Sequence, residues 1–330
     1  MNPADPNILI KGLHKQDRRL LSKTITLIES ARPDHHQLAR KIVDEVLPHT
    51  GKAIRLGITG VPGVGKSTFI ESLGMLLVQS GHRVAVLAVD PSSSRSGGSV
   101  MADKTRMEKL AVEENAFIRP SPSGGTLGGV ARKTRETMLV CEAAGFDVII
   151  VETVGVGQSE TTVASMVDFF LVLMLAGAGD ELQGIKRGVL ELADALAINK
   201  ADGDNIEKAQ KAAKIYTTAL HMLQPASPNW DPPVLTCSAL EMTGIAEIWQ
   251  MVLKFHKQFT RSGELEHKRR KQALDWLWSM VEDELKQRFY NNPEIRQRLD
   301  QIKRAVARGE TAPTLAADKL LFFLDNQRSV

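Results

Sequence analysis

Three zones follow one another along the chain, and each has its own spacing of hydrophobic residues. In residues 1–53 apolar side chains recur every three or four positions, as on the buried face of an amphipathic helix. Residues 54–260 instead contain short continuous apolar runs, most of them separated by helical patterns. Residues 261–330 return to helical spacing. We therefore expect an N-terminal helical extension over 1–53, a central domain over 54–260 and a C-terminal helical arm over 261–330.

The apolar runs of the central zone predict β-strands that are buried on both faces. The six runs are Ile54–Thr59, Val84–Val89, Val148–Val151, Phe169–Leu175, Ala195–Ile198 and Val234–Thr236. Such strands, alternating with helices, are typical of a parallel sheet that helices cover on both sides. The predicted fold class is therefore α/β, with a doubly wound, mostly parallel sheet and helical extensions at both ends.

A phosphate-binding motif follows the first of these strands. Residues 60–67 read Gly-Val-Pro-Gly-Val-Gly-Lys-Ser and match G-x-x-x-x-G-K-[ST] between a strand and a predicted helix over Ser67–Gln79. In such a P-loop, backbone N–H groups surround the phosphates, Lys66 neutralises phosphate oxygens and the Ser67 hydroxyl can bind Mg²⁺. The predicted phosphate-binding residues of this P-loop NTPase are Gly60, Val61, Pro62, Gly63, Val64, Gly65, Lys66, Ser67 and Thr68.

Acidic residues near the ends of two strands are candidate partners of Mg²⁺ and of the attacking water. Asp90 follows the second strand, and Asp103 lies in the glycine- and serine-rich stretch behind it, although a turn or helix cap would also explain either residue. Glu152 closes the strand over 147–151 and opens Glu-Thr-Val-Gly, where Gly155 can donate its backbone N–H to a γ-phosphate. The predicted metal ligands are Ser67, Asp90, Asp103 and Glu152.

A guanine-recognition motif follows the strand Ala195–Ile198. Residues 199–202 read Asn-Lys-Ala-Asp and fit N-K-x-D. The Asp202 carboxylate can accept hydrogen bonds from N1–H and the 2-amino group of guanine, and adenine offers neither donor, so each lost bond costs about 1.5–3 kcal/mol. The predicted nucleotide-binding set adds Gly155, Asn199, Lys200, Asp202, Cys237, Ser238 and Ala239, the last two resembling a segment whose backbone contacts the guanine oxygen. The motifs therefore predict GTP and GDP as ligands.

Composition narrows the remaining function classes. The 330 residues carry 42 basic and 39 acidic side chains, a net charge of +3 that does not indicate a nucleic-acid-binding protein. Two cysteines indicate neither a disulfide framework nor a metal cage, and the longest apolar run, over 169–179, is too short to span a membrane. The basic run over 267–271 predicts the start of a solvated helix, with phosphate contacts as the alternative. We expect a cytoplasmic protein without a signal peptide.

Taken together, these motifs resemble those of the methylmalonyl-CoA mutase-associated GTPases, the MeaB/ArgK family of the metallochaperone-like class. The resemblance covers roughly residues 10–325 and rests on the P-loop, on Asp-Pro-Ser-Ser from Asp90, on Glu-Thr-Val-Gly-Val-Gly-Gln-Ser-Glu from Glu152, and on the glycine-rich stretch that begins at Pro120. It implies a homodimeric, Mg²⁺-dependent GTPase whose C-terminal helices form much of the dimer contact. It also implies a chaperone that gates cobalamin loading and protects or reactivates methylmalonyl-CoA mutase.

The resemblance also assigns roles to individual residues. It implies a mobile segment over Ala178–Lys186 that relays the signal of the partner, with Lys186 as the lysine that stimulates hydrolysis. The implied catalytic residues are Lys66, Asp103, Glu152 and Lys186. Which acidic residue orients the attacking water stays open between Asp103 and Glu152.

Two other functions remain as alternatives. A nickel-type metallochaperone GTPase shares the glutamate that follows the strand, although the sequence has no Cys/His motif near the nucleotide site and no His-rich N-terminus. A kinase or ATPase linked to basic amino-acid transport would need an acceptor site beside the γ-phosphate, and Asp202 favours GTP over ATP. Both alternatives leave the P-loop assignment unchanged.

Overall fold

The computed structural model describes residues 5–89, 107–120, 127–153, 159–177, 187–223 and 227–325. Two compact units divide the chain, one ending at Gln272 and the other beginning at Ala273. Four predicted site residues, Asp90, Asp103, Gly155 and Lys186, lie outside the described residues.

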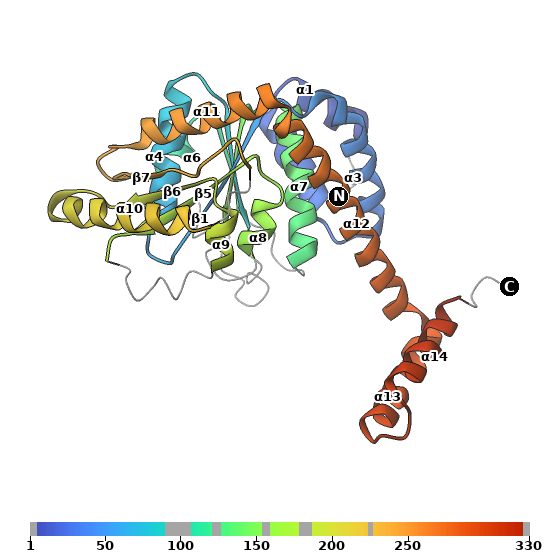
Figure 1. Ribbon diagram of the computed structural model, residues 1–330. Helices are drawn as coiled ribbons and strands as arrows, with labels where there is room; N and C mark the ends of the chain where they lie inside the picture. The colour runs from blue at the N-terminus through green and yellow to red at the C-terminus, as the bar shows by residue number, and fades with distance from the viewer. Residues whose placement is uncertain are drawn as a thin grey trace. The chain divides into compact units, whose positions relative to one another are not determined.

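A seven-stranded sheet forms the centre of the first unit (Figure 1). The strands are β1 (Ile54–Gly60), β2 (Val84–Val89), β3 (Ala116–Arg119), β4 (Val148–Thr153), β5 (Phe169–Leu175), β6 (Ala195–Asn199) and β7 (Val234–Thr236). Their order across the sheet is β3-β2-β4-β1-β5-β6-β7, and every neighbouring pair is parallel. The carboxyl ends of β1, β4, β5 and β6 therefore meet at one edge, where ligands bind in sheets of this type.

Helices precede the first strand, connect most of the strands and follow the last strand of the sheet. The α-helices are α1 (Pro6–His14), α2 (Arg18–Glu29), α3 (Pro33–Val46), α4 (Lys66–Gln79), α6 (Glu108–Ala111), α7 (Leu127–Ala143), α8 (Ser159–Ala164), α9 (Arg187–Leu192), α10 (Ile206–His221), α11 (Ile245–Ser262), α12 (Glu264–Asn291), α13 (Pro293–Ala307) and α14 (Pro313–Asp325). Two 3₁₀ turns, Leu47–His49 and Gly203–Asn205, complete the described elements. The predicted α/β fold with helical extensions at both ends is confirmed.

Each face of the sheet carries its own hydrophobic core. On one face, side chains of α4, α6 and α11 pack against strand residues such as Ile58 and Ile150. On the other face, α7, α8, α9 and α10 pack against strand residues such as Ile149 and Val172. Strands buried on both sides need apolar residues at nearly every position, which explains the continuous apolar runs of the sequence.

The N-terminal helices extend the core on the α7 side (Figure 1). Leu21 and Ile25 of α2 and Ile42 of α3 are fully buried there. Arg119 at the end of β3 donates from Nε to Glu29 at 2.9 Å, which ties α2 to the edge of the sheet. The amphipathic pattern of residues 1–53 thus serves packing against the central domain.

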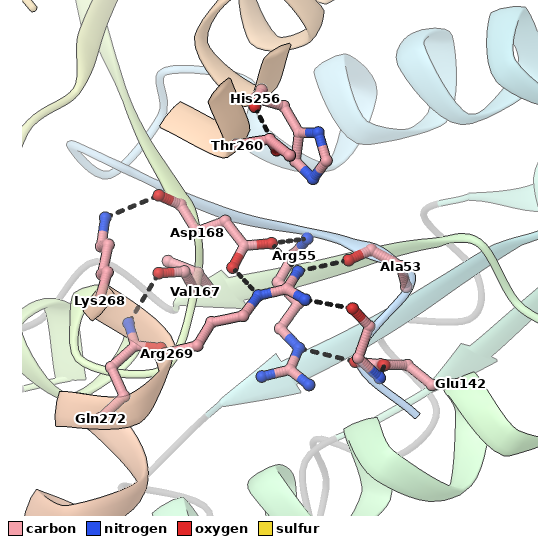
Figure 2. Close-up of polar contacts among 11 residues, drawn as sticks. Ala53, Arg55, Glu142, Val167, Asp168, His256, Thr260, Lys268, Arg269 and Gln272 are labelled. Atoms are coloured by element: carbon pink, nitrogen blue, oxygen red, sulfur yellow. Dashed lines mark hydrogen bonds and ion pairs between the residues drawn. The ribbon is translucent and has the colours of Figure 1, made fainter. Parts of the chain in front are cut away.

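The first two turns of α12 hold the amino ends of β1 and β5 (Figure 2). Arg269 donates from Nε and Nη2 to the two carboxylate oxygens of Asp168, at 2.7 and 2.6 Å, and from Nη2 to the Ala53 carbonyl at 2.7 Å. Lys268 donates to the Asp168 carbonyl at 2.6 Å, and Gln272 donates to the carbonyl one residue earlier at 2.9 Å. We refer to Lys268, Arg269 and Gln272 as the α12 clamp.

A second ion pair continues from the α12 clamp toward α7 (Figure 2). The Arg55 backbone N–H donates to Asp168 at 2.8 Å, and its Nε donates to Glu142 at 2.6 Å. The prediction of a solvated helix start over 267–271 is therefore wrong for Lys268 and Arg269, because they neutralise carboxylates that the sheet buries. The adjacent Arg270 does follow the prediction, since it pairs with Glu266 in the solvent.

Helices α13 and α14 belong to the second unit, together with the part of α12 that follows Gln272. Asn292 begins α13 by accepting backbone N–H bonds from Glu294 and Ile295. Large apolar side chains stay exposed along α12 and α14, namely Leu274, Leu277, Trp278, Val281, Leu285, Leu315, Leu321 and Phe322.

Candidate functional site

The predicted P-loop joins β1 to α4 at the carboxyl edge of the sheet. The Lys66 ammonium donates to the Gly60 carbonyl at 2.9 Å and lies 3.5 Å from the Val61 carbonyl, so the side chain folds back over its own loop. Ser67 is half-buried in the first turn of α4, and Thr68 is exposed beside it. Val64 is fully buried and holds the loop against the core. The loop thus leaves Pro62 and Gly63 exposed at its tip.

Two glycines of the loop have steric reasons to be glycine. A Cβ on Gly60 would lie 2.5 Å from the Leu173 carbonyl oxygen of β5, so no side chain fits there. Gly65 has a φ of +90° at the start of α4, a left-handed conformation that glycine adopts without cost. Gly60 thus brings the loop against the backbone of β5, and the left-handed turn at Gly65 starts α4, so the N–H groups of the loop can point toward a phosphate.

Asn199, at the end of β6, connects the phosphate loop to the predicted base-recognition segment. Its Nδ2 donates to the Val64 carbonyl at 2.8 Å, and its Oδ1 accepts the Ala239 backbone N–H at 3.1 Å. The residue is 1% exposed, so both bonds lie away from solvent. Asn199 therefore fixes the distance between the two halves of the site.

Asp202 is oriented by a neighbouring hydroxyl. The Ser238 Oγ donates to Asp202 Oδ2 at 2.5 Å and accepts the Glu241 backbone N–H at 3.1 Å. Lys200 adopts a φ of +60° and its carbonyl accepts a bond from the Asn205 side chain at 2.6 Å, which shapes the turn between Asn199 and Asp202. These bonds fix the orientation of the Asp202 carboxylate next to the segment that follows β7.

Cys237 and Ala239 complete the predicted nucleotide-binding set. The Cys237 backbone N–H continues the sheet by donating to Ile198 at 2.9 Å, and its thiol contacts Asn199 Oδ1 at 3.6 Å. Burial raises the pKa of the Cys237 thiol to about 12, so this thiol stays protonated and serves packing. Ala239 is buried, and its carbonyl accepts a hydrogen bond of 2.7 Å from Ser72 of α4.

Glu152 lies within β4, one residue before the end of the strand. The strand was expected to end at residue 151, just before Glu152, and it is therefore longer than expected. It pairs in register with Ile58 of β1, whose side chain lies in the core on the α4 side of the sheet. Paired residues of parallel strands point to the same face, so Glu152 is on the face from which α4 and its Lys66 begin. The next residues of the two strands point to the opposite face of the sheet, where the buried hydroxyls of Thr59 and Thr153 lie 2.7 Å apart.

Sequence reasoning overlooked Ser72 and the threonine pair that links β1 to β4. Single hydroxyl residues inside a helix or strand carry no motif, and only the tertiary structure brings Ser72 to Ala239. Of the predicted residues, the structure brings together the P-loop, Asn199, Asp202 and the segment from Cys237 to Ala239. Asp90, Asp103, Gly155 and Lys186 remain predictions outside the described residues.

Metal clusters and membrane-spanning helices are both missing from the part of the chain that the structure describes. No group of three or more His, Cys, Asp or Glu side chains gathers there in an arrangement that could hold a metal ion. None of the helices in the described ranges combines the length and apolar character needed to cross a membrane.

Comparisons of this chain with known proteins point to one protein family. The family model described as "Methylmalonyl Co-A mutase-associated GTPase MeaB" matches residues 21–294. A Caulobacter vibrioides protein named as a GTPase is 57% identical over 322 residues, covering 97% of this chain and 98% of that protein. The mouse "methylmalonic aciduria type A homolog, mitochondrial" is 46% identical over 323 residues, covering 95% of this chain and 78% of that protein. The crystal structure of a protein named "LAO/AO transport system kinase" superposes with a TM-score of 0.79 and 42% identity, covering 98% of this chain and 99% of that one.

Proposed function

This chain belongs to the MeaB family of P-loop GTPases, and on that basis we propose that it is a chaperone of a cobalamin-dependent methylmalonyl-CoA mutase. In this role, GTP binding and hydrolysis gate cobalamin loading and protect or reactivate the mutase. The observation that carries it is the family match over residues 21–294, which includes the whole nucleotide site and the start of the C-terminal helices. The family name supports the choice of partner.

Guanine selectivity is assigned to the carboxylate of Asp202. Ser238 donates to one oxygen and so orients this carboxylate, whose two oxygens would accept one bond from N1–H and one from the 2-amino group of guanine. In an Asp202→Asn protein, the side-chain amide N–H would face the 2-amino group of guanine, and two donors cannot bond to each other. GTP affinity should therefore fall. Xanthosine triphosphate carries an acceptor oxygen in place of the 2-amino group and should bind better. Each lost charge-assisted bond corresponds to about a tenfold or larger loss in affinity. Unchanged GTP affinity in this variant would contradict the assignment.

Hydrolysis is assigned to charge stabilisation around the γ-phosphate. Lys66, which folds over the P-loop, would neutralise the oxygens of the transferring phosphoryl group. Mg²⁺ is the metal that fits the donors, because the Ser67 hydroxyl and the Glu152 carboxylate are oxygen ligands near one edge of the sheet. Held by these residues, the ion would supply positive charge to the phosphate oxygens. We assign Asp90 and Asp103 to the same ion, and Asp103 or Glu152 to orienting the attacking water.

We assign Lys186 as the cation that accelerates hydrolysis once the mutase binds. P-loop GTPases without an inserted cation are slow, and a supplied cation adds about 10³–10⁵ in rate. A Lys186→Ala protein should therefore keep its slow basal turnover and lose most stimulation by the mutase. Full stimulation of that variant would overturn this role while leaving the partner assignment intact.

The experiment that tests the proposed function is GTP turnover by the purified chain with and without purified methylmalonyl-CoA mutase. A slow basal rate that the mutase raises many-fold, together with a complex visible by gel filtration, supports the chaperone function. A rate indifferent to the mutase, with no complex, overturns the partner assignment and leaves the GTPase activity standing.

The same preparations distinguish the alternatives. Tight, stoichiometric Ni²⁺ or Zn²⁺ after equilibration and dialysis would favour a metallochaperone. Transfer of γ-phosphate to a protein acceptor would favour a kinase, the activity that the name of the solved relative states. Release of inorganic phosphate alone is the expected result for a GTPase.

A further inference from the structure

One buried hydrogen bond connects the helix that follows the P-loop to the base-recognition segment. The Ser72 Oγ of α4 donates to the Ala239 carbonyl at 2.7 Å, across 167 residues of sequence. Ser72 is 8% exposed and Ala239 is 5% exposed, so water does not compete with this bond. The bond is therefore a direct contact between the two halves of the site.

Two side chains hold Ala239, Ser72 at its carbonyl and Asn199 at its N–H. The Ala239 N–H donates to Asn199 Oδ1 at 3.1 Å, while its carbonyl accepts from Ser72. The N–H and the carbonyl of Ala239 belong to the two peptide planes that flank the residue. Asn199 and Ser72 therefore hold one plane each, which restricts rotation of the backbone at Ala239. Because α4 also carries Lys66 and Ser67, a single rigid helix sets the position of both the phosphates and the base-recognition segment.

We propose that Ser72 is a positioning residue for guanine recognition, acting through the backbone of Ala239. The inference rests on the proposed guanine site and adds to it a residue that touches no nucleotide. Ser72 holds Ala239, and with it the neighbouring Ser238, whose Oγ donates to the Asp202 carboxylate that is assigned to guanine. Its effect is therefore expected on the choice between the bases and not on the binding of phosphates.

The size of the effect follows from the bond that would be lost. Ser72→Ala leaves the Ala239 carbonyl buried without its donor, so this segment is held less firmly before the base binds. Nucleotide binding must then order the segment, and a cost equal to one neutral hydrogen bond corresponds to about a 3- to 10-fold loss of affinity. Alanine is a good helix former, so α4 should stay intact in this variant. Ser80→Ala is the matched control, because Ser80 ends the same helix and its Oγ donates locally to the Leu76 carbonyl at 2.8 Å.

The experiment measures displacement of a fluorescent GDP analogue by GDP and by ADP from the full chain and from three variants. Ser72→Ala should weaken GDP binding about 3- to 10-fold and leave ADP binding unchanged, so that the ratio of the two affinities falls. Ser80→Ala should leave both affinities as they are. Thermal unfolding followed by circular dichroism confirms that each variant is folded.

Two results would overturn the inference. One is GDP binding by Ser72→Ala equal to that of the unaltered chain, and the other is an equal loss for GDP and ADP, which would mean that Ser72 only supports α4. The third variant, Asp202→Asn, separates this failure from failure of the guanine site. If Asp202→Asn loses GDP and Ser72→Ala does not, only the role of Ser72 falls; if Asp202→Asn binds GDP normally, the guanine site itself is misassigned.

Discussion

At the scale of single residues, Asp168 shows how a buried charge is tolerated. Its side chain is 1% exposed, and it accepts two bonds from Arg269 and one from the Arg55 backbone N–H. Burial by itself would lower the pKa of the Arg269 guanidinium, but the hydrogen bonds and charge of Asp168 outweigh it and raise that pKa. The Arg269 guanidinium therefore keeps its charge beside Asp168, and each partner depends on the other.

Removing the cation of this pair should destabilise the protein strongly. Arg269→Gln leaves the Asp168 carboxylate buried without its counter-ion, which costs about 3–5 kcal/mol of unfolding free energy. Arg270→Gln is the matched control, since the Arg270–Glu266 pair is 74% and 69% exposed and contributes about 0–1 kcal/mol. Urea unfolding of both variants measures the difference, and equal losses would contradict the argument.

His256 gives the same region a dependence on pH. Burial is the main cause that lowers the pKa of this imidazole. The negative charge of Asp168 raises this pKa, and the positive charge of Arg269 lowers it further. As the pH falls through about 6.5, the unfolded chain takes up a proton that the folded chain resists, so stability should fall below that pH. His256→Gln should show a smaller loss between pH 7.5 and 5.5 in urea unfolding. The same loss in the variant and the unaltered chain would assign the effect to other groups.

At the scale of secondary structure elements, the P-loop depends on the packing of β1 against β5. A methyl group on Gly60 would meet the Leu173 carbonyl, which belongs to the backbone and cannot rotate away. We expect Gly60→Ala to cost about 3 kcal/mol, the upper end of the range for overpacking, and to lose GDP binding. Gly63→Ala is the control, because a methyl group on Gly63 would meet no atom within 4 Å. Its only cost in folding free energy is about 1 kcal/mol, for a side chain at a φ of +78°. Denaturant unfolding with and without GDP measures both, and a larger loss for Gly63→Ala would contradict the steric argument.

Local pattern predicted most of these elements, because strands buried on both faces leave a continuous apolar signal. Phe169–Leu175, Val84–Val89 and Val234–Thr236 were predicted with the bounds that the structure gives them. β3 (Ala116–Arg119) was missed, since it has four residues, lies at an edge and is only half buried at its last two positions. The order of the strands, and contacts such as Ser72 with Ala239, depend on segments far apart in sequence, which no local pattern records.

At the scale of the whole molecule, the exposed apolar side chains of α12 fit the homodimer that the family resemblance implies, and we propose a dimer contact there. Leu277 is 48% exposed and Trp278 is 62% exposed, and large apolar groups of this kind on a helix commonly form a contact with another chain. The family resemblance likewise implies a dimer contact in these C-terminal helices.

Charging these positions should therefore weaken self-association. A buried aromatic anchor contributes about 2 kcal/mol or more, so Trp278→Glu should raise the dimer Kd by about 30-fold or more. Val112→Glu is the control, because Val112 is 80% exposed on the first unit, away from these helices in sequence. Sedimentation velocity over a range of concentrations measures the result, and a dimer unaffected by Trp278→Glu would place the contact elsewhere.

The α12 clamp also determines where the chain could be cut. A chain that ends at residue 260 would retain the whole predicted nucleotide site, but it would lose Arg269 and Lys268, the cations that face Asp168 and Asp194. A chain that ends at Gln272 keeps both cations and the contact of Gln272 with the turn before β5. We therefore expect the shortest fragment that folds and binds GTP to include the first two turns of a helix that belongs, for the rest of its length, to the other unit.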